Sequence, residues 1–186
     1  MVNDAAFIAD ATVTESVPGE IVFTSNDIAS LVALQLMTEV ADQLKKHIFY
    51  GRALNEDKIK ELKKQVRNLL DESESIEVTS TSITLDEHVR ICHSIIGLNT
   101  ESGELLNVLN DIVEKGTYDR INFLEEMGDC QWYTGTALDA TNSTYQTLFD
   151  LVIAKLKKRY PNGKFESDRA INRDVEVEYT EMGKHA

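Results

Sequence analysis

Two pairs of acidic residues have a spacing and a setting that could support chemistry. Glu101 and Glu104 are three residues apart, and so are Glu126 and Asp129. Residues three apart share one face of an α-helix, so each pair would present two carboxylates side by side. Both pairs lie among apolar residues with helical spacing, which predicts that they face the protein interior. These apolar neighbours are Leu98, Leu105, Val108, Phe123, Met127, Cys130 and Tyr133.

If the two helices pack antiparallel, four carboxylates converge. Their repulsion and lost hydration would have to be relieved by protons or by cations. Oxygen ligands select hard ions, which indicates Mg²⁺, with Mn²⁺ as an alternative. A di-iron bundle would need Glu-x-x-His, and no histidine of this chain has a glutamate three residues before it. The competing interpretation is that the pairs point outward and that Gly103 and Gly128 only allow close helix packing.

The elements that must position these pairs are helices. Only two prolines and nine glycines are present, too few for the turns of an all-β sandwich. The apolar residues follow helical periodicity over most of the chain. We therefore predict an all-α helical bundle with short connections. The predicted helices span 25–51, with Ser25 or Asn26 as the cap, then about 55–70, 86–116, 118–140 and 143–160.

The segments between and around these helices predict the division of the chain. The first 24 residues are small and acidic and read as a flexible arm that docks through Phe7, Ile8 and residues 21–23. Residues 71–84 are rich in Ser, Thr and Glu and are typical of a linker. The expected parts are an N-terminal arm at 1–24, a helical pair with its linker at 25–80, a core at 81–166 and a C-terminal tail at 167–186.

Composition excludes several classes of function. The net charge of −13 argues against binding to duplex DNA or to an anionic membrane, both of which need a basic face. No apolar run reaches the roughly 18 residues that span a bilayer. The first basic residue is Lys45, so no secretory or transit signal is expected. Cys92 and Cys130 have no metal-binding spacing and are expected to be reduced, which favours the cytoplasm.

Three segments together resemble a known family. They are His93–Leu105 (HSIIGLNTESGEL), Leu124–Tyr133 (LEEMGDCQWY) and Ile153–Pro161 (IAKLKKRYP). In this order they resemble the MazG-like, all-α nucleoside triphosphate pyrophosphohydrolases, especially the short phage and bacterial members. That family carries Glu-x-x-Glu, then Glu-x-x-Asp after a gap, and here 21 residues separate Glu104 from Glu126. The resemblance covers roughly residues 84–166, with a weaker echo at 170–174 (AINRD).

The resemblance implies a MazG-like four-helix core and Mg²⁺-dependent cleavage of a nucleoside triphosphate, expected to be a dNTP, to monophosphate and diphosphate. It implies that Glu101 and Glu104 are catalytic, with Glu101 as the expected base. Phosphate-binding candidates are Lys155, Arg159 and Tyr160, whose alternative is a solvated basic helix end. The implied metal ligands are Glu101, Glu104, Glu126 and Asp129. The candidates for the base pocket are His93, Asn99, Trp132 and Tyr133. The alternative is that these four side chains only pack in the hydrophobic core.

One observation leaves a second interpretation open. Many relatives have Asn where this chain has Val152, so a phosphate or metal contact of the family is missing here. A catalytically weak protein of the same fold, binding nucleotides or a protein partner, is therefore the alternative, and a purely structural bundle is the third. Relatives commonly form dimers or tetramers, so a homodimer or homotetramer in the cytoplasm of a bacterium or a phage-infected host is expected.

A shift of 65 residues aligns the N-terminal helices with the later ones. Glu39 then falls on Glu104 and Gly51 falls on Gly116. However, Leu36 replaces Glu101 and Lys64 replaces Asp129, so a second metal site would have lost two ligands. The hypothesis is a degenerate half-repeat that lends Lys45, Lys46, His47 or Arg52 to the ligand. The alternative is that two amphipathic helices resemble each other by chance.

Overall fold

The computed structural model describes residues 4–73 and 78–185. This part of the chain contains eight helices and one two-stranded sheet, so the prediction of an all-α fold is confirmed. None of its helices is long and apolar enough to cross a membrane. The helices are α1 (Asp4–Thr12), α2 (Ser25–Tyr50), α3 (Glu56–Ser73), α4 (Asp86–Lys115), α5 (Arg120–Ala140), α6 (Tyr145–Arg159), α7 (Ser167–Ile171) and α8 (Val175–Met182), and the strands are β1 (Ile21–Thr24) and β2 (Ser80–Ile83).

The chain divides into two compact units. The first contains the described residues up to Ile21, those from Ile83 to Ile153, and His185. The second contains the described residues of Val22–Ser82 and of Ala154–Lys184. The boundary after Ile153 falls within α6, so the core predicted at 81–166 is shared between the units. The expected MazG-like four-helix core stays a prediction.

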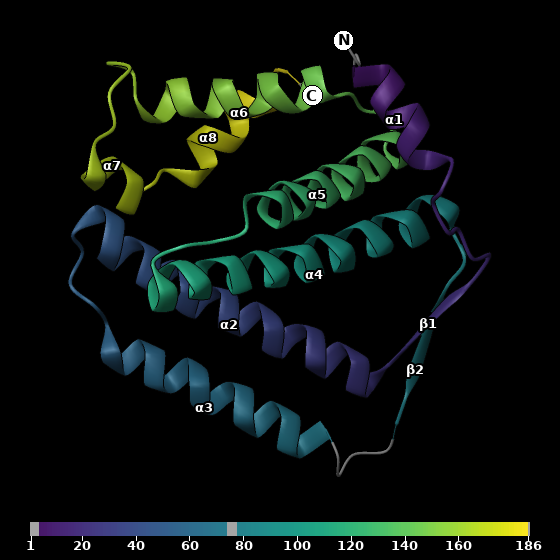
Figure 1. The fold of residues 1–186 in the computed structure, drawn as a ribbon, viewed down its shortest axis with the longest axis horizontal. Helices are drawn as coiled ribbons and strands as arrows, with labels where there is room; N and C mark the ends of the chain where they lie inside the picture. Colours follow the sequence, from purple (N-terminus) through teal and green to yellow (C-terminus); the bar gives the residue numbers. More distant parts are fainter. Residues whose placement is uncertain (1–3, 74–77, 186) are drawn as a thin grey trace. The chain divides into compact units, whose positions relative to one another are not determined.

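The first unit is built on the α4–α5 hairpin. The two helices lie side by side along their length, joined by a short turn (Figure 1). Gly116 ends α4 in the left-handed conformation, with φ 69°, which a residue without a β-carbon adopts freely. Asp119 then caps α5, because its carboxylate accepts hydrogen bonds from the backbone N–H groups of Ile121 and Asn122. The tight turn forces the two helices to run antiparallel, as the sequence predicted.

The N-terminal segment is part of this unit. The prediction of a flexible arm is wrong for Asp4–Thr12, which form α1 and pack against α5. The predicted docking through Phe7 and Ile8 is confirmed, because both pack with Leu138 and Tyr145. Burial of these apolar side chains offsets the entropy lost when the segment becomes ordered. The low charge and small residues of α1 concealed this amphipathic helix in the sequence.

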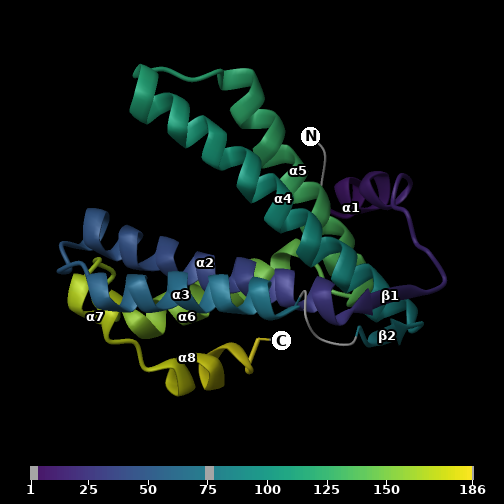
Figure 2. The same ribbon diagram turned by 90° about the horizontal axis from the view of Figure 1, so that it is seen from below.

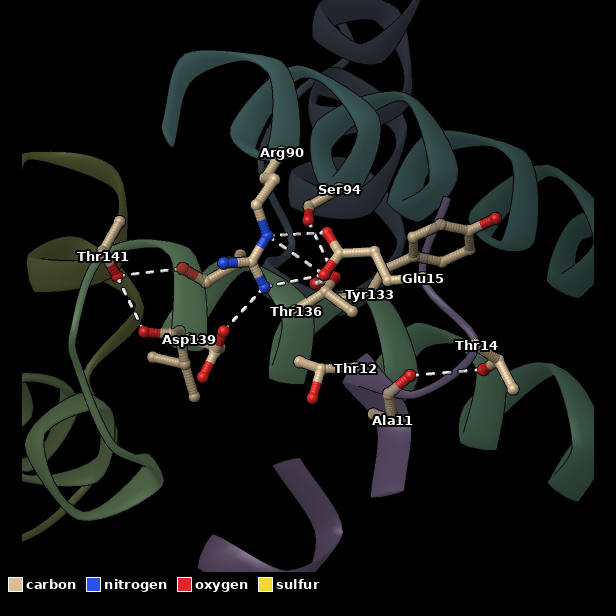
Figure 3. A network of polar contacts seen from close by, with 12 residues as sticks. Ala11, Thr12, Thr14, Glu15, Arg90, Ser94, Tyr133, Thr136, Asp139 and Thr141 are labelled. Carbon is tan, nitrogen blue, oxygen red and sulfur yellow. Dashed lines mark hydrogen bonds and ion pairs between the residues drawn. The ribbon is translucent and has the colours of Figure 1, made fainter. Parts of the chain in front are cut away.

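Polar contacts fix α1 and its following turn to the hairpin. Arg90 of α4 donates to both carboxylate oxygens of Glu15, at 2.7–3.1 Å, and to Asp139 of α5 at 2.7 Å (Figure 3). The side chains of Glu15 and Arg90 are only 2% and 14% exposed. One guanidinium therefore joins three segments that are far apart in sequence.

The second unit contains the α2–α3 hairpin, which Figure 2 shows as two helices side by side. Thr24 caps α2. The prediction that Ser25 or Asn26 is the cap is wrong. The Thr24 hydroxyl and the Asp27 carboxylate each accept a bond from the other's backbone, which forms a capping box. Strand β1, which ends at this cap residue, pairs with β2. Both strands were missed, because a four-residue strand carries too short a pattern to be recognised.

The predicted linker at 71–84 is only partly described. Helix α3 continues to Ser73 and β2 begins at Ser80, so both ends of the predicted linker have regular structure. Residues 74–77 lie outside the described part of the chain. The predicted tail at 167–186 contains α7 and α8.

The half-repeat hypothesis receives local support from the two hairpin turns. Gly51 and Gly116, which the shift of 65 aligns, end their helices with nearly the same backbone angles, φ 68° and φ 69°. The chemistry differs, because Glu39, which aligns with Glu104, forms an ion pair with Lys58 at 3.3 Å. Glu39 is thus paired with a lysine, and the repeat itself stays a hypothesis.

Candidate metal centre

The α4–α5 hairpin brings the predicted carboxylates together. Glu101, Glu126 and Asp129 each offer one oxygen, and these three oxygens all lie within 4.8 Å of one another. Glu104 is close enough to Glu126 for its charge to raise the pKa of that carboxyl. Three of the four predicted carboxylates therefore converge. Glu104 and Asp129 are exposed, so the expectation that both pairs face the interior does not hold for these two residues.

The cluster is partly withdrawn from water. Glu126 is buried, at 6% exposure, whereas Glu101 is half-buried and Glu104 and Asp129 are exposed. Burial raises the pKa of the Glu126 carboxyl, and the negative charge of Glu104 raises it further. The buried oxygen thus lies at the inner end of the cluster, and the exposed carboxylates lie toward solvent.

The donor set fits a hard divalent cation. All of the grouped atoms are carboxylate oxygens, which is the chemistry that Mg²⁺ and Mn²⁺ prefer. Cys130, which follows Asp129 in the chain, is half-buried. Burial raises the pKa of the Cys130 thiol, and the charges of Glu101 and Asp129 raise it further, so the thiol stays neutral. A zinc site with thiolate ligands is therefore not favoured.

The hydroxyl of Thr100 lies 3.1 Å from Oε1 of Glu101 and also donates to the Gly97 carbonyl. The hydroxyl has a single proton, and the shorter bond, at 2.7 Å, goes to Gly97, so the contact with Glu101 is the weaker one. The sequence analysis missed Thr100, since a threonine on a helix surface carries no pattern that predicts such a contact.

Gly103 and Gly128 do not serve close packing. A β-carbon at either position would meet no atom within 4 Å. The glycine at a close contact is Gly97, where the α5 ring of Tyr133 covers the backbone. The alternative explanation for the two glycines of the acidic motifs is thus not supported.

Three of the four predicted base-binding residues form one aromatic group. His93, Trp132 and Tyr133 meet edge to face, with ring centroids 4.8–6.1 Å apart. Burial raises the pKa of the Tyr133 hydroxyl, and the charges of Glu101 and Asp129 raise it further. This ring therefore feels the field of the acidic cluster. Asn99 instead donates to the carbonyl of Ile95 on its own helix, at 2.8 Å. The buried Nδ1 of His93 has no hydrogen-bond partner among the described residues.

The predicted phosphate-binding residues belong to the second unit. Arg159 donates to both carboxylate oxygens of Glu178, at 2.7 and 2.6 Å, and these two side chains are 14% and 4% exposed. Tyr160 packs against Phe165, with ring centroids 5.8 Å apart, and Lys155 is half-buried. The guanidinium of Arg159 is therefore already engaged by a carboxylate of the same chain.

Glu178 was missed by the sequence analysis. Its surroundings in sequence are acidic and polar, so nothing local predicts a buried carboxylate. The only signal was the echo of the family at residues 170–174, just before α8.

No protein-family model, curated protein or solved structure matches this chain. The function is therefore inferred from the residues and their geometry.

Proposed function

We propose that this protein is a Mg²⁺-dependent nucleoside triphosphate pyrophosphohydrolase of the MazG-like type, with Mn²⁺ as an alternative metal. The observation that carries the proposal is the convergence of Glu101, Glu126 and Asp129, whose grouped oxygens lie within 4.8 Å of one another, with the charge of Glu104 close to Glu126. Carboxylates at this separation, one of them buried, repel one another unless protons or cations intervene. Their identity and order along the chain are those that the family resemblance implies.

The four carboxylates would hold the metal, which supplies charge neutralisation of the triphosphate and activation of a water for attack at the α-phosphorus. The chain's own residues then have distinct roles. Glu126, buried between the helices, would anchor the cluster from within. Glu101, which is only half-buried, is the residue we assign as the acceptor of the water's proton. The substrate would be a nucleoside triphosphate, and a dNTP is the expected form.

The aromatic group beside the cluster supports a base-binding role. His93, Trp132 and Tyr133 present ring edges and faces against which a base could stack. The unpartnered Nδ1 of His93 is a polar atom that a ligand could satisfy. Asn99 is the weakest of the four candidates, because its amide is bonded to its own helix.

One observation favours the second candidate, a catalytically weak nucleotide-binding protein. Arg159 is paired with Glu178, so a phosphate would have to compete with a bidentate carboxylate for this arginine. Val152 also replaces the asparagine of many relatives. Metal-dependent turnover separates the two candidates.

The decisive experiment is a product assay over NTPs and dNTPs, with and without Mg²⁺, that resolves mono- from diphosphates. Monophosphate plus diphosphate, formed only with metal, would establish the reaction. Glu104→Gln should abolish turnover and leave the far-UV circular dichroism unchanged. The control is Glu114→Gln, an exposed carboxylate on the same helix, which should retain full activity. Full turnover by Glu104→Gln would overturn the site.

We also propose a homodimer or homotetramer. Large apolar side chains at the hairpin end are exposed, including Val113 at 76% and Ile121 at 77%. Large apolar side chains with this exposure favour association with another protein surface. Light scattering coupled to size exclusion would give the mass in solution, and a monomer at all concentrations would refute the proposal.

A further inference from the structure

The end of α6, helix α7 and the start of α8 border a cavity in the second unit. Its volume is about 120 Å³. One buried water needs only about 10–15 Å³ on such a measure, so a ligand of several heavy atoms has room. The lining residues are Lys158, Arg159, Arg169, Asn172, Arg173, Asp174, Val177 and Glu178.

The lining has an excess of positive charge. It carries four cationic side chains and two carboxylates, although the whole chain has a net charge of −13. The cations come from separate places, since Lys158 and Arg159 end α6, Arg169 lies in α7 and Arg173 precedes α8. Compensation of the α6 dipole would explain only the residues in the last turn of α6. The convergence of the two later arginines on the same cavity therefore needs another explanation.

The carboxylates do not use up these cations. Glu178 is saturated by Arg159, and Arg173 reaches the same carboxylate only at 3.5 Å, with its own side chain 44% exposed. Asp174 accepts from the backbone N–H of Val177, where it caps α8. Lys158 has no ion-pair partner within residues 4–73 and 78–185. Lys158 and Arg173 thus keep donors available to the cavity.

Arg169 is held beside them. Its Nε donates to Glu166 at 2.8 Å, and its Nη1 lies 3.4 Å from the carbonyl oxygen of Arg159. These two contacts orient the guanidinium. Its remaining N–H groups can donate to an oxyanion.

We propose that this cavity binds a phosphate-bearing anion, with Lys158 and Arg173 as the principal donors and Arg169 beside them. The neutral Arg159–Glu178 pair forms the buried wall of the site. The inference goes beyond the proposed function, because the site uses none of the four carboxylates of the candidate metal centre and needs no metal ion. Free phosphate or pyrophosphate and the phosphate chain of a nucleotide share this chemistry.

The test is calorimetric titration of the full chain in EDTA at constant ionic strength. The probes are inorganic phosphate, pyrophosphate, a dNTP and a nucleoside without phosphates. We expect pyrophosphate or the dNTP to bind and the nucleoside not to bind. Tighter binding of pyrophosphate would identify a free anion as the ligand, and tighter binding of the dNTP would identify a nucleotide. Failure of every phosphate compound to bind above a chloride control would overturn the proposal.

Variants locate the binding. Lys158→Gln and Arg173→Gln should each weaken binding about tenfold or more, since each removes a charge-assisted hydrogen bond. The matched control is Lys157→Gln, which changes an exposed lysine next to Lys158 that does not line the cavity. An equal loss in the control would show that only the general field is involved and would overturn the site.

Failure of the anion site can be distinguished from failure of the proposed function. Lys158 makes no contact with Glu178, so its variant tests the site even if Arg173→Gln is poorly folded. Glu104→Gln should bind the anion as the parent chain does in EDTA. If the parent chain shows no turnover but binds the anion, only the proposed function is refuted. If it shows turnover but does not bind the anion in EDTA, only the anion site is refuted.

Discussion

Gly97 of α4 lies directly against the aromatic ring of Tyr133 of α5. A β-carbon at position 97 would overlap the Cε1, Cζ and Cδ1 atoms of that ring. Position 97 is one helical turn before Glu101, and Tyr133 is one turn after Asp129. The contact therefore sets the separation of the two helices beside the acidic cluster. The sequence pattern predicted close packing at Gly103 and Gly128, the glycines of the acidic motifs. It gave no indication that Gly97 is the glycine at the contact.

Gly97→Ala should destabilise the fold. The added methyl group must displace the Tyr133 ring, and overpacking of this kind costs about 1–3 kcal/mol. Gly103→Ala on the same helix is the control, because its methyl group meets open space and should stabilise the helix by about 0.5–1 kcal/mol. Urea unfolding of both variants measures the difference. Equal stability of Gly97→Ala and the parent chain would contradict the packing assignment.

Glu126→Gln should make the metal-free protein more stable at neutral pH. The change removes a buried carboxylate whose pKa is raised by burial and by the neighbouring Glu104 charge. Mg²⁺ should raise the Tm of the parent chain, because the ion binds only the folded site, and should not raise the Tm of the variant. Thermal unfolding in EDTA and in Mg²⁺ provides the four values. Glu125→Gln, an exposed neighbour, should keep the Mg²⁺ response. The same Mg²⁺ shift in Glu126→Gln and the parent chain would argue against this ligand set.

Glu15→Gln should weaken the attachment of the N-terminal segment. Glu15 is 2% exposed and accepts three hydrogen bonds from Arg90, so its loss leaves a largely buried arginine without its main partner. Breaking one partner of a buried pair costs roughly 3–5 kcal/mol. Asp139→Asn removes the more exposed partner, at 44%, and should cost less. Chemical denaturation ranks the two variants, and a larger effect from Asp139→Asn would reverse the assignment.

Glu178→Gln should destabilise the protein in a pH-dependent way. The hydrogen bonds from Arg159 hold the pKa of the Glu178 carboxyl below its ordinary value of 4.5. A lowered pKa in the folded state means that this stabilisation is fully present above pH 4.5. It is lost as the pH falls through the lower folded-state value. The parent chain should thus exceed the variant in stability at neutral pH, and the gap should narrow in acid.

The control for that experiment is Glu176→Gln, an exposed glutamate on the same helix. Its unfolding curve should stay close to that of the parent chain. A gap between the parent chain and Glu178→Gln that does not change below pH 4.5 would show that the ion pair is not its source.

The candidate metal centre was largely predictable, because its elements are local. Glu101 and Glu104 are three residues apart on a helix whose face the apolar pattern defines, and Glu126 and Asp129 repeat this arrangement. The turn between the helices was also visible, because Gly116 ends α4 as expected. A short turn between two amphipathic helices leaves one way for them to pack, which is antiparallel.

The contacts that fix the remaining segments were not predictable. Glu15 and Arg90 are 75 residues apart, and Arg159 and Glu178 are 19 apart. A glutamate in an acidic stretch has the same sequence pattern whether it is solvated or buried against an arginine. The flexible arm was a wrong prediction for the same reason, since α1 is stabilised by Leu138 and Tyr145 and not by its own propensity.

The helices and the residue types that meet at the acidic cluster could thus be predicted from the sequence, because helical periodicity is a property of residues three and four apart. The buried faces could not, since Met127, which the pattern placed toward the interior, is exposed. The tertiary structure alone decided that Glu126 is the buried member, that Gly97 admits the Tyr133 ring, and that Glu178 engages Arg159. These outcomes depend on which distant surfaces exclude water from each other, and burial of that kind is created only when the chain folds back on itself.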